Sequence, residues 1–183
     1  FQIVTTVLLG LLLTPALAAY LGDQQTDNDI TKQITINGGY QTLIIRRQLR
    51  VAIIEQRSPS GSWKTIWNYN TGYIASKVLS QGACFVSVMN RNEMPSFDSL
   101  LSSVTVGNNL KGQEQYTREI TFNVIRRPVR DLQTYGTEIY AMCSGLPTYV
   151  AYEVQRPQYT IYNQGSCIRL DVLQLVNLNY CQS

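Results

Sequence analysis

Histidine is absent from this chain of 183 residues, and its absence excludes much familiar chemistry. Histidine is the usual general base near neutral pH and the commonest zinc ligand in proteins. The sequence also lacks a glycine-rich phosphate loop, an EF-hand loop and the Asn-x-Ser/Thr signal for N-glycosylation. We therefore predict no catalytic residues, no metal and no other cofactor.

Charged residues are scarce as well, at 15% of the chain with a net charge of +3. A nucleic-acid reader needs a concentrated basic patch, so we predict no nucleic-acid partner. The acidic residues could in principle supply a catalytic pair, but we interpret them as solvated surface charges: Asp98, Glu114, Glu119, Asp131, Glu138, Glu153 and Asp171. We expect no enzyme, and an activity screen would test for a hydrolase.

Long hydrophobic runs are missing too, because none reaches the roughly 20 residues that span a membrane. Residues 7–13 are apolar and lead to Ala16-Leu17-Ala18, the small-x-small pattern that signal peptidase cleaves. We predict a signal peptide over residues 1–18. Because the chain opens on Phe1, we interpret it as the product of a coding sequence truncated at its 5′ end. The mature protein should be secreted, passing through secretory granules, with no stable membrane anchor.

Only four cysteines occur: Cys84, Cys143, Cys167 and Cys181. An even number in a secreted chain predicts two disulfides, for which the residues alone leave three connectivities open. Cysteines held in disulfides cannot act as thiolate nucleophiles.

The N-terminal part of the chain combines a polar stretch with strand patterns. Residues 19–28 are polar, and we expect them to be mobile. Residues 33–36 and 42–45 flank Asn37-Gly38-Gly39, which predicts a hairpin, and a third strand should cover 49–55. The turn-forming residues from Ser58 to Ser62 then indicate a domain boundary.

Beyond this boundary the periodicity predicts an antiparallel meander and two helices. Alternation predicts strands over 63–69, 73–79 and 84–89. Apolar residues share one face of a predicted helix, with Pro95 in its first turn: Phe97, Leu100, Leu101 and Val104. Later elements should be a strand over 116–125, a helix over 129–143, strands over 148–155 and 159–163, and a β-prone stretch over 167–180. The pattern is typical of an α+β domain.

Three blocks carry a resemblance to a known family. They are residues 63–75, residues 84–89 running into 94–100, and residues 142–149. In order and residue type these blocks resemble the BRICHOS domain, and the layout of the chain is similar to the gastrokine family. The resemblance implies an antiparallel five-stranded sheet flanked by two helices. It also implies a bridge from Cys84 to Cys143, which leaves Cys167 to pair with Cys181.

We accordingly predict an α+β, BRICHOS-like fold in four parts. Residues 1–18 are the signal peptide, 19–62 a mobile N-terminus with a β-rich segment, 63–150 the BRICHOS domain, and 151–183 a β-prone region closed by the second disulfide. The C-terminal stretch over 168–180 has the high β-propensity and low charge of aggregating segments, and folding it against the sheet would hide it.

The family resemblance implies a protein of gastric surface mucous cells that protects the mucosa and restrains epithelial growth. It also implies chaperone-like binding of β-prone or amyloidogenic polypeptides, among them the chain's own C-terminal region. The alternative is a growth-regulating ligand of an epithelial cell-surface receptor with no chaperone role. Client-binding candidates are aromatic residues that otherwise form the core: Trp63, Trp67, Tyr69, Tyr73 and Tyr149, with Tyr152 in the same series.

Asn68 stands where the resemblance places an aspartate. The resemblance implies that this acid tunes pH-dependent opening or association, whereas an amide does not titrate. We predict weaker acid-dependent assembly than in an Asn68→Asp variant, unless Asn68 is an ordinary strand residue.

Overall fold

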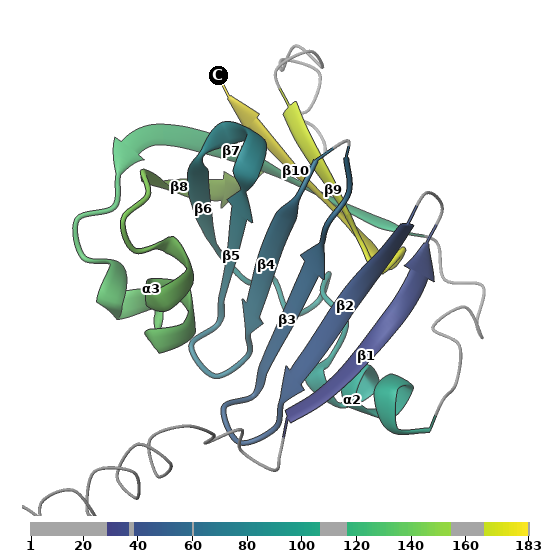
Figure 1. The fold of residues 1–183 in the computed structure, drawn as a ribbon. Helices are drawn as coiled ribbons and strands as arrows, with labels where there is room; N and C mark the ends of the chain where they lie inside the picture. Colours follow the sequence, from purple (N-terminus) through teal and green to yellow (C-terminus); the bar gives the residue numbers. More distant parts are fainter. Residues whose placement is uncertain (1–28, 37–38, 60, 107–116, 155–166, 183) are drawn as a thin grey trace, which may run out of the picture.

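Ten strands form one continuous sheet in a computed structural model that describes residues 29–36, 39–59, 61–106, 117–154 and 167–182 (Figure 1). The spatial order is β1-β2-β3-β4-β5-β6-β8-β7-β10-β9. The strands are β1 (Asp29–Ile36), β2 (Gly39–Arg46), β3 (Val51–Gln56), β4 (Trp63–Asn68), β5 (Tyr73–Val78), β6 (Ala83–Val88), β7 (Arg118–Pro128), β8 (Thr148–Glu153), β9 (Cys167–Val172) and β10 (Val176–Gln182). The predicted leader, the segment 19–28 and the predicted strand 159–163 lie outside the described residues.

The expected α+β class is confirmed, but the expected five-stranded sheet is wrong, because the sheet has ten strands. Five of them, β4 to β8, form its middle. Strands β1 to β3 extend it on one side, where β3 pairs with β4. The β9–β10 hairpin extends it on the other side, where β10 runs parallel to β7.

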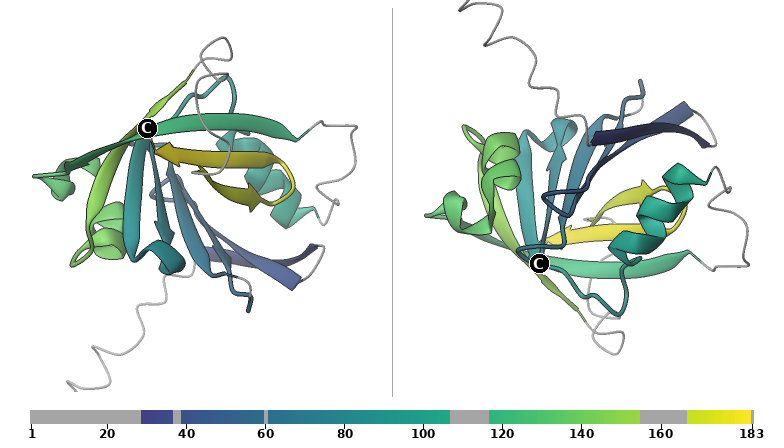
Figure 2. Two further views of the ribbon diagram at one scale, coloured as in Figure 1. Left: turned by 90° about the horizontal axis from the view of Figure 1, so that it is seen from above. Right: turned by 90° about the horizontal axis from the view of Figure 1, so that it is seen from below.

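The sheet curls, so that β9 and β10 come round toward β2, and α2 (Phe97–Thr105) lies between β1 and β7 (Figure 2). Helix α3 (Thr137–Cys143) lies against the opposite, outer face (Figure 1). Alternate side chains of β4 enter two different cores: Trp63 and Trp67 belong to a large inner core, and Ile66 to a smaller outer core under α3. The period of two in a strand sorts residues to the two faces.

The N-terminal hairpin matches its predicted position and packs on the rest of the molecule. Strands β3 and β4 pair antiparallel without a break, from Val51 opposite Asn68 to Gln56 opposite Trp63. A carboxylate of β3, Glu55, accepts a hydrogen bond from Lys64 of β4, which lowers the pKa of Glu55. The predicted boundary at residue 62 therefore falls inside one sheet.

Helix α2 begins close to its predicted position. The side chain of Ser96 accepts a hydrogen bond from the backbone N–H of Ser99 and caps the helix. Pro95 precedes this cap, so its predicted place in the first turn is wrong by two positions. Phe97 and Leu100 are buried in the inner core, as the apolar periodicity predicted.

The single helix predicted over 129–143 is divided in two. A short 3₁₀ helix, η2 (Leu132–Tyr135), precedes α3, and Gly136 separates them with a φ of 110°. That backbone conformation belongs almost exclusively to glycine, so the helix cannot continue through this position. Val129 lies in the first part of the expected helix, but its backbone N–H donates instead to the carbonyl of Thr148 at 2.8 Å.

The C-terminal stretch predicted to be β-prone folds as a hairpin against the sheet. Strands β9 and β10 pair antiparallel, with Cys167 opposite Cys181. Its apolar side chains are buried in the inner core: Leu170, Val172, Val176, Leu178 and Tyr180. In the part of the chain that the structure describes, no helix is long and apolar enough to cross a membrane.

Candidate binding surface

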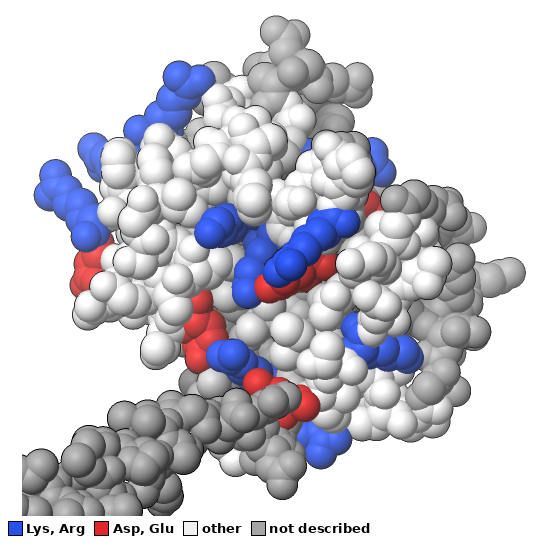
Figure 3. All heavy atoms as spheres, in the orientation of Figure 1, with Lys and Arg blue, Asp and Glu red and all other residues white. Residues whose placement is uncertain are grey.

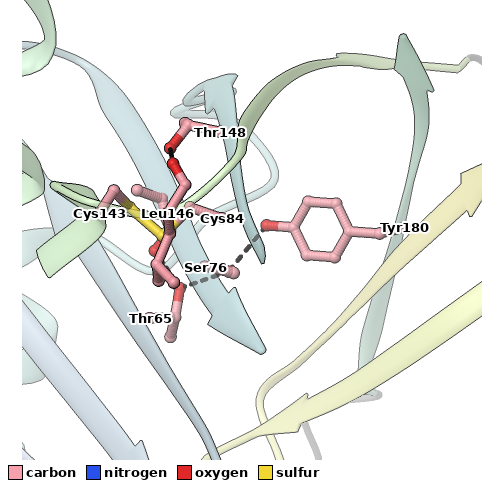
Figure 4. Close-up of a disulfide and its surroundings, with 8 residues drawn as sticks. Thr65, Ser76, Cys84, Cys143, Leu146, Thr148 and Tyr180 are labelled. Carbon is pink, nitrogen blue, oxygen red and sulfur yellow. Dashed lines mark hydrogen bonds between the residues drawn. A yellow bond between two sulfur atoms is a disulfide. The ribbon is translucent and has the colours of Figure 1, made fainter. Parts of the chain in front are cut away.

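The two disulfides confirm the pairing that the family resemblance implied. Cys84 of β6 bonds to Cys143 at the end of α3, with a Cα–Cα distance of 5.8 Å (Figure 4). Cys167 bonds to Cys181 across the β9–β10 hairpin. The first bridge closes a loop of 59 residues and fixes α3 to the outer face, which by loop-closure entropy stabilises the fold by about 4 kcal/mol.

Helix α3 covers only part of the outer face. Beyond it, residues from β5, β6, β8 and η2 line a groove of about 420 Å³. We define the outer groove by its six large apolar and aromatic residues: Tyr73, Val86, Val88, Tyr135, Val150 and Tyr152. Val88 is 65% exposed and Tyr152 is 57% exposed, so the groove presents apolar surface to solvent.

Strand pairing explains why these residues meet. Strands β6 and β8 run parallel, with Val86 opposite Val150, and residues two positions further along point to the same face. That spacing brings Val88 and Tyr152 to the outer face as well. The rings of Tyr73 and of Tyr135 from η2 meet in a T-shaped contact, with centroids 4.8 Å apart, and both residues line the groove.

The electrostatics of the outer groove suit apolar partners better than proton transfer. Burial, assisted by the neighbouring Tyr73, raises the pKa of Tyr135, so its hydroxyl stays neutral at physiological pH. Glu153 is the single charged residue among the described residues that line the groove. The surface can therefore hold alternate apolar side chains of an extended chain.

The predicted client-binding residues are divided between the core and the groove. Trp63, Trp67 and Tyr69 are buried in the inner core, where the Tyr69 hydroxyl donates to the carbonyl of Pro95 at 2.6 Å. Tyr149 is half-buried and stacks on Phe85. In this conformation the two tryptophans and Tyr69 offer no exposed ring, and their role as client contacts stays a prediction.

Only Tyr73 and Tyr152 of the aromatic series line the outer groove. Sequence reasoning missed Val86, Val88, Tyr135 and Val150. The period-two spacing of Val86 with Val88, and of Val150 with Tyr152, was available as a signal. This spacing could not show that the two pairs of residues lie side by side, because that depends on the parallel pairing of β6 with β8, which no local pattern specifies.

Asn68 is buried at the outer end of β4, 3% exposed, beneath the junction between η2 and α3. Its side-chain oxygen accepts hydrogen bonds from the backbone N–H groups of Asn70 and Thr71, both at 3.0 Å. These bonds close the turn between β4 and β5. An ionised aspartate could accept the same two bonds, while burial would oppose its charge.

Charged side chains are dispersed over the face that Figure 3 shows, several of them beside a residue of opposite sign. Within the described ranges, no group of three or more His, Cys, Asp or Glu residues could hold a metal ion.

Comparison with known proteins identifies the family. A profile of the BRICHOS domain matches residues 59–150, which contain almost all of the five central strands. Gastrokine-1 of Homo sapiens is 32% identical over 99% of this chain and 96% of its own length. The chain belongs to the gastrokine family. Among other gastrokines, gastrokine-1 of Mus musculus is 29% identical over 95% of the chain and 91% of its own length. Gastrokine-2 of Rattus norvegicus is 28% identical over 79% and 80%. No solved structure matches the chain.

The BRICHOS match accounts for the five strands that the family resemblance implied. Gastrokine relatives align over nearly the whole chain, so β1 to β3 and the β9–β10 hairpin lie in the aligned length but outside the BRICHOS match. The fold of this gastrokine is a BRICHOS sheet extended at both edges.

Proposed function

We propose that this chain is a secreted, non-enzymatic protein of the gastric mucosa that binds extended, β-prone polypeptides and delays their conversion to amyloid. The observation that carries the proposal is the outer groove, a solvent-facing apolar surface beside a disulfide-anchored helix. Membership of the gastrokine family supports the mucosal assignment. Protection of the mucosa and restraint of epithelial growth belong to the same proposal.

The binding mode follows from the spacing of the groove. Side chains on one face of a strand repeat every second residue, so an extended client presents an apolar row of the same period. Tyr73, Val88 and Tyr152 offer wide apolar contacts to such a row. Covering an apolar client segment in this way removes the surface from which a fibril grows.

Groove variants test the binding. The double variant Val88→Asp with Tyr152→Asp places two carboxylates in the groove. We expect this variant to lose the delay in fibril growth, which is measured by thioflavin fluorescence. The probe is a synthetic fibril-forming peptide of alternating valine and threonine. The matched control, Leu49→Asp with Leu79→Asp, places the same charges at exposed leucines outside the groove and should delay fibrils as the unmodified protein does. Equal delay by both variants, or no delay by the unmodified protein at an equimolar ratio, contradicts the proposal.

Growth assays on epithelial cells separate this function from that of a receptor ligand. If growth restraint depends on client binding, the groove variant loses it and the control keeps it. If restraint persists in the groove variant, the chain acts through a cell-surface receptor by another surface. Secretion is tested by expressing the chain behind an initiator methionine and sequencing the N-terminus of the protein in the medium, which should begin at Ala19.

A further inference from the structure

The sheet of the described residues ends in two edge strands, β1 and β9. An edge strand presents unpaired backbone N–H and C=O groups, onto which another strand can add. Proteins usually protect such edges with charges, proline, bulges or short length. The two edges of this sheet differ in that protection.

Strand β9 is protected. It has six residues, and the exposed charged side chains of Arg169 and Asp171 interrupt it. A disulfide closes one end at Cys167, and the side chain of Gln41 from β2 hydrogen-bonds to the other end, donating to the carbonyl of Asp171 at 2.6 Å.

Strand β1 lacks these protections. Its eight residues, Asp29–Ile36, contain neither proline nor glycine, and they pair with β2 in an unbroken register. Its exposed side chains beyond Asp29 are uncharged: Thr31, Gln33 and Thr35. Asp29 forms an ion pair with Arg46 of β2 at 3.2 Å.

The one lysine of β1 does not protect the edge against strand addition either. Lys32 turns under the sheet, and its ammonium group donates to the carbonyl of Ser103 in α2 at 2.8 Å. This carbonyl lies near the C-terminal end of the helix, where a positive charge is favoured. The charge is thereby held away from the free edge.

We propose that β1 pairs antiparallel with β1 of a second copy of the chain, about a twofold axis at Gln33. In this register Ile30 lies opposite the partner's Ile36, Thr31 opposite the partner's Thr35, and Lys32 opposite the partner's Ile34. Residues of matching exposure face one another, and no like charges meet. The partly exposed Ile30 of each copy therefore meets Ile36 of the other copy between the two paired strands.

Neighbouring registers that keep the same faces together are less favourable. An axis at Lys32 places two ammonium groups opposite each other, which destabilises a strand pair. An axis at Thr31 pairs only residues 29–33, and an axis at Ile34 pairs only residues 32–36, whereas the axis at Gln33 pairs residues 30–36. A twofold pairing at one edge also closes on itself, so it forms dimers and not fibres.

The proposed dimer does not depend on client binding. Strand β1 lies outside residues 59–150 that match the BRICHOS domain, and the outer groove is built from β5, β6, β8 and η2. Pairing at β1 therefore leaves the groove open, and the N-terminal extension of the family domain acquires a role of its own.

Charge exchange at one cross-strand pair tests the register. Thr31→Lys with Thr35→Lys places lysine opposite the partner's lysine twice in each dimer. Thr31→Lys with Thr35→Glu places lysine opposite glutamate at the same positions. Sedimentation velocity over a concentration series should show a dimer of the unmodified chain. Its dissociation constant should rise at least about tenfold in the Lys/Lys variant relative to the Lys/Glu variant, because two repulsive pairs replace two attractive pairs.

Equal urea unfolding midpoints, measured at a concentration at which both variants are monomeric, establish that the two substitutions leave the monomer equally stable. High salt should narrow the difference between their dissociation constants. A monomeric unmodified chain, equal dissociation constants of the two variants, or a ladder of species larger than the dimer each overturns the proposal.

Discussion

At the scale of single residues, a chain of hydroxyl groups crosses the inner core (Figure 4). Thr65 donates to the carbonyl of Ala75, so its oxygen must accept from Ser76, whose oxygen in turn accepts from Tyr180. The two hydroxyl–hydroxyl distances are 2.9 and 2.8 Å. The ring of Tyr180 stacks between Phe85 and Phe122. Tyr180 thus links β10 to β5 through a hydrogen bond that its hydroxyl can donate only while it is neutral.

Burial raises the pKa of Tyr180 far above the ordinary value of 10.0. A raised folded-state pKa gives stability that is complete below pH 10 and is lost as the pH rises toward the folded value. We expect Tyr180→Phe to cost about 1 kcal/mol at pH 7 and to weaken the alkaline loss of stability. Urea unfolding at pH 7 and pH 11 measures both effects, with Tyr140→Phe at an exposed site as control. The idea fails if Tyr180→Phe loses as much stability at pH 11 as the unmodified chain.

Asn68 makes a second prediction at this scale. Because an amide does not titrate, this site contributes no acid-dependent change in the unmodified chain, whereas Asn68→Asp introduces a buried acid between two backbone donors. We expect Asn68→Asp to change its sedimentation between pH 7 and pH 5 more than the unmodified protein does. The same shift in both proteins would remove the role of this position.

At the scale of elements, Gly136 decides where helices can form. A Cβ atom there would lie 2.9 Å from Nδ2 of Asn68 and 3.4 Å from Cγ2 of Thr71, at a φ that other residues rarely adopt. We expect Gly136→Ala to destabilise the fold by about 3 kcal/mol, measured by urea unfolding. Gly82→Ala, at a φ of 57° with open space around the added atom, should cost only about 1 kcal/mol. Equal costs would show that the contact with Asn68 carries no weight.

Element boundaries were predictable where local chemistry marks them. Alternation and turn residues gave β4, β5 and β6 almost as observed, and the apolar face gave α2. The β9–β10 turn was missed because Leu173 and Gln174 take positive φ without a glycine to signal it. The two-part helix was missed because a glycine within an apolar helical pattern does not by itself show that the backbone takes a positive φ, as Gly136 does at 110°.

At the scale of the whole molecule, the sheet order could not be derived from local patterns. The parallel pairings of β6 with β8 and of β7 with β10 join segments far apart in the chain, and the first of them brings together residues that line the outer groove. The family resemblance supplied the central strands and the disulfides. It left out the strands on either side, which pair with the central strands through β3 and β10 and also contact each other across the curl.

Gln41 makes the principal hydrogen-bonded contact between the strands on either side. Its side chain, fully buried in β2, accepts from the N–H of Leu173 at 2.7 Å and donates to the carbonyl of Asp171 and to Gln56. Removing it leaves buried polar groups of the β9–β10 turn unpaired. We expect Gln41→Ala to cost about 3 kcal/mol in urea unfolding, while Gln48→Ala at an exposed turn changes stability by less than about 0.5 kcal/mol.

Amide hydrogen exchange shows whether Gln41 stabilises both the β1–β2 and the β9–β10 hairpins or only the strand in which it lies. If Gln41 holds the curl closed, Gln41→Ala should speed amide exchange in β9 and β10 as well as in β2, although about 130 residues separate these strands along the chain. Strands β5 and β6, held by the Cys84–Cys143 bridge and the outer core, should keep their protection. Faster exchange confined to β2 and its neighbours would mean that the C-terminal hairpin is held by its apolar contacts alone.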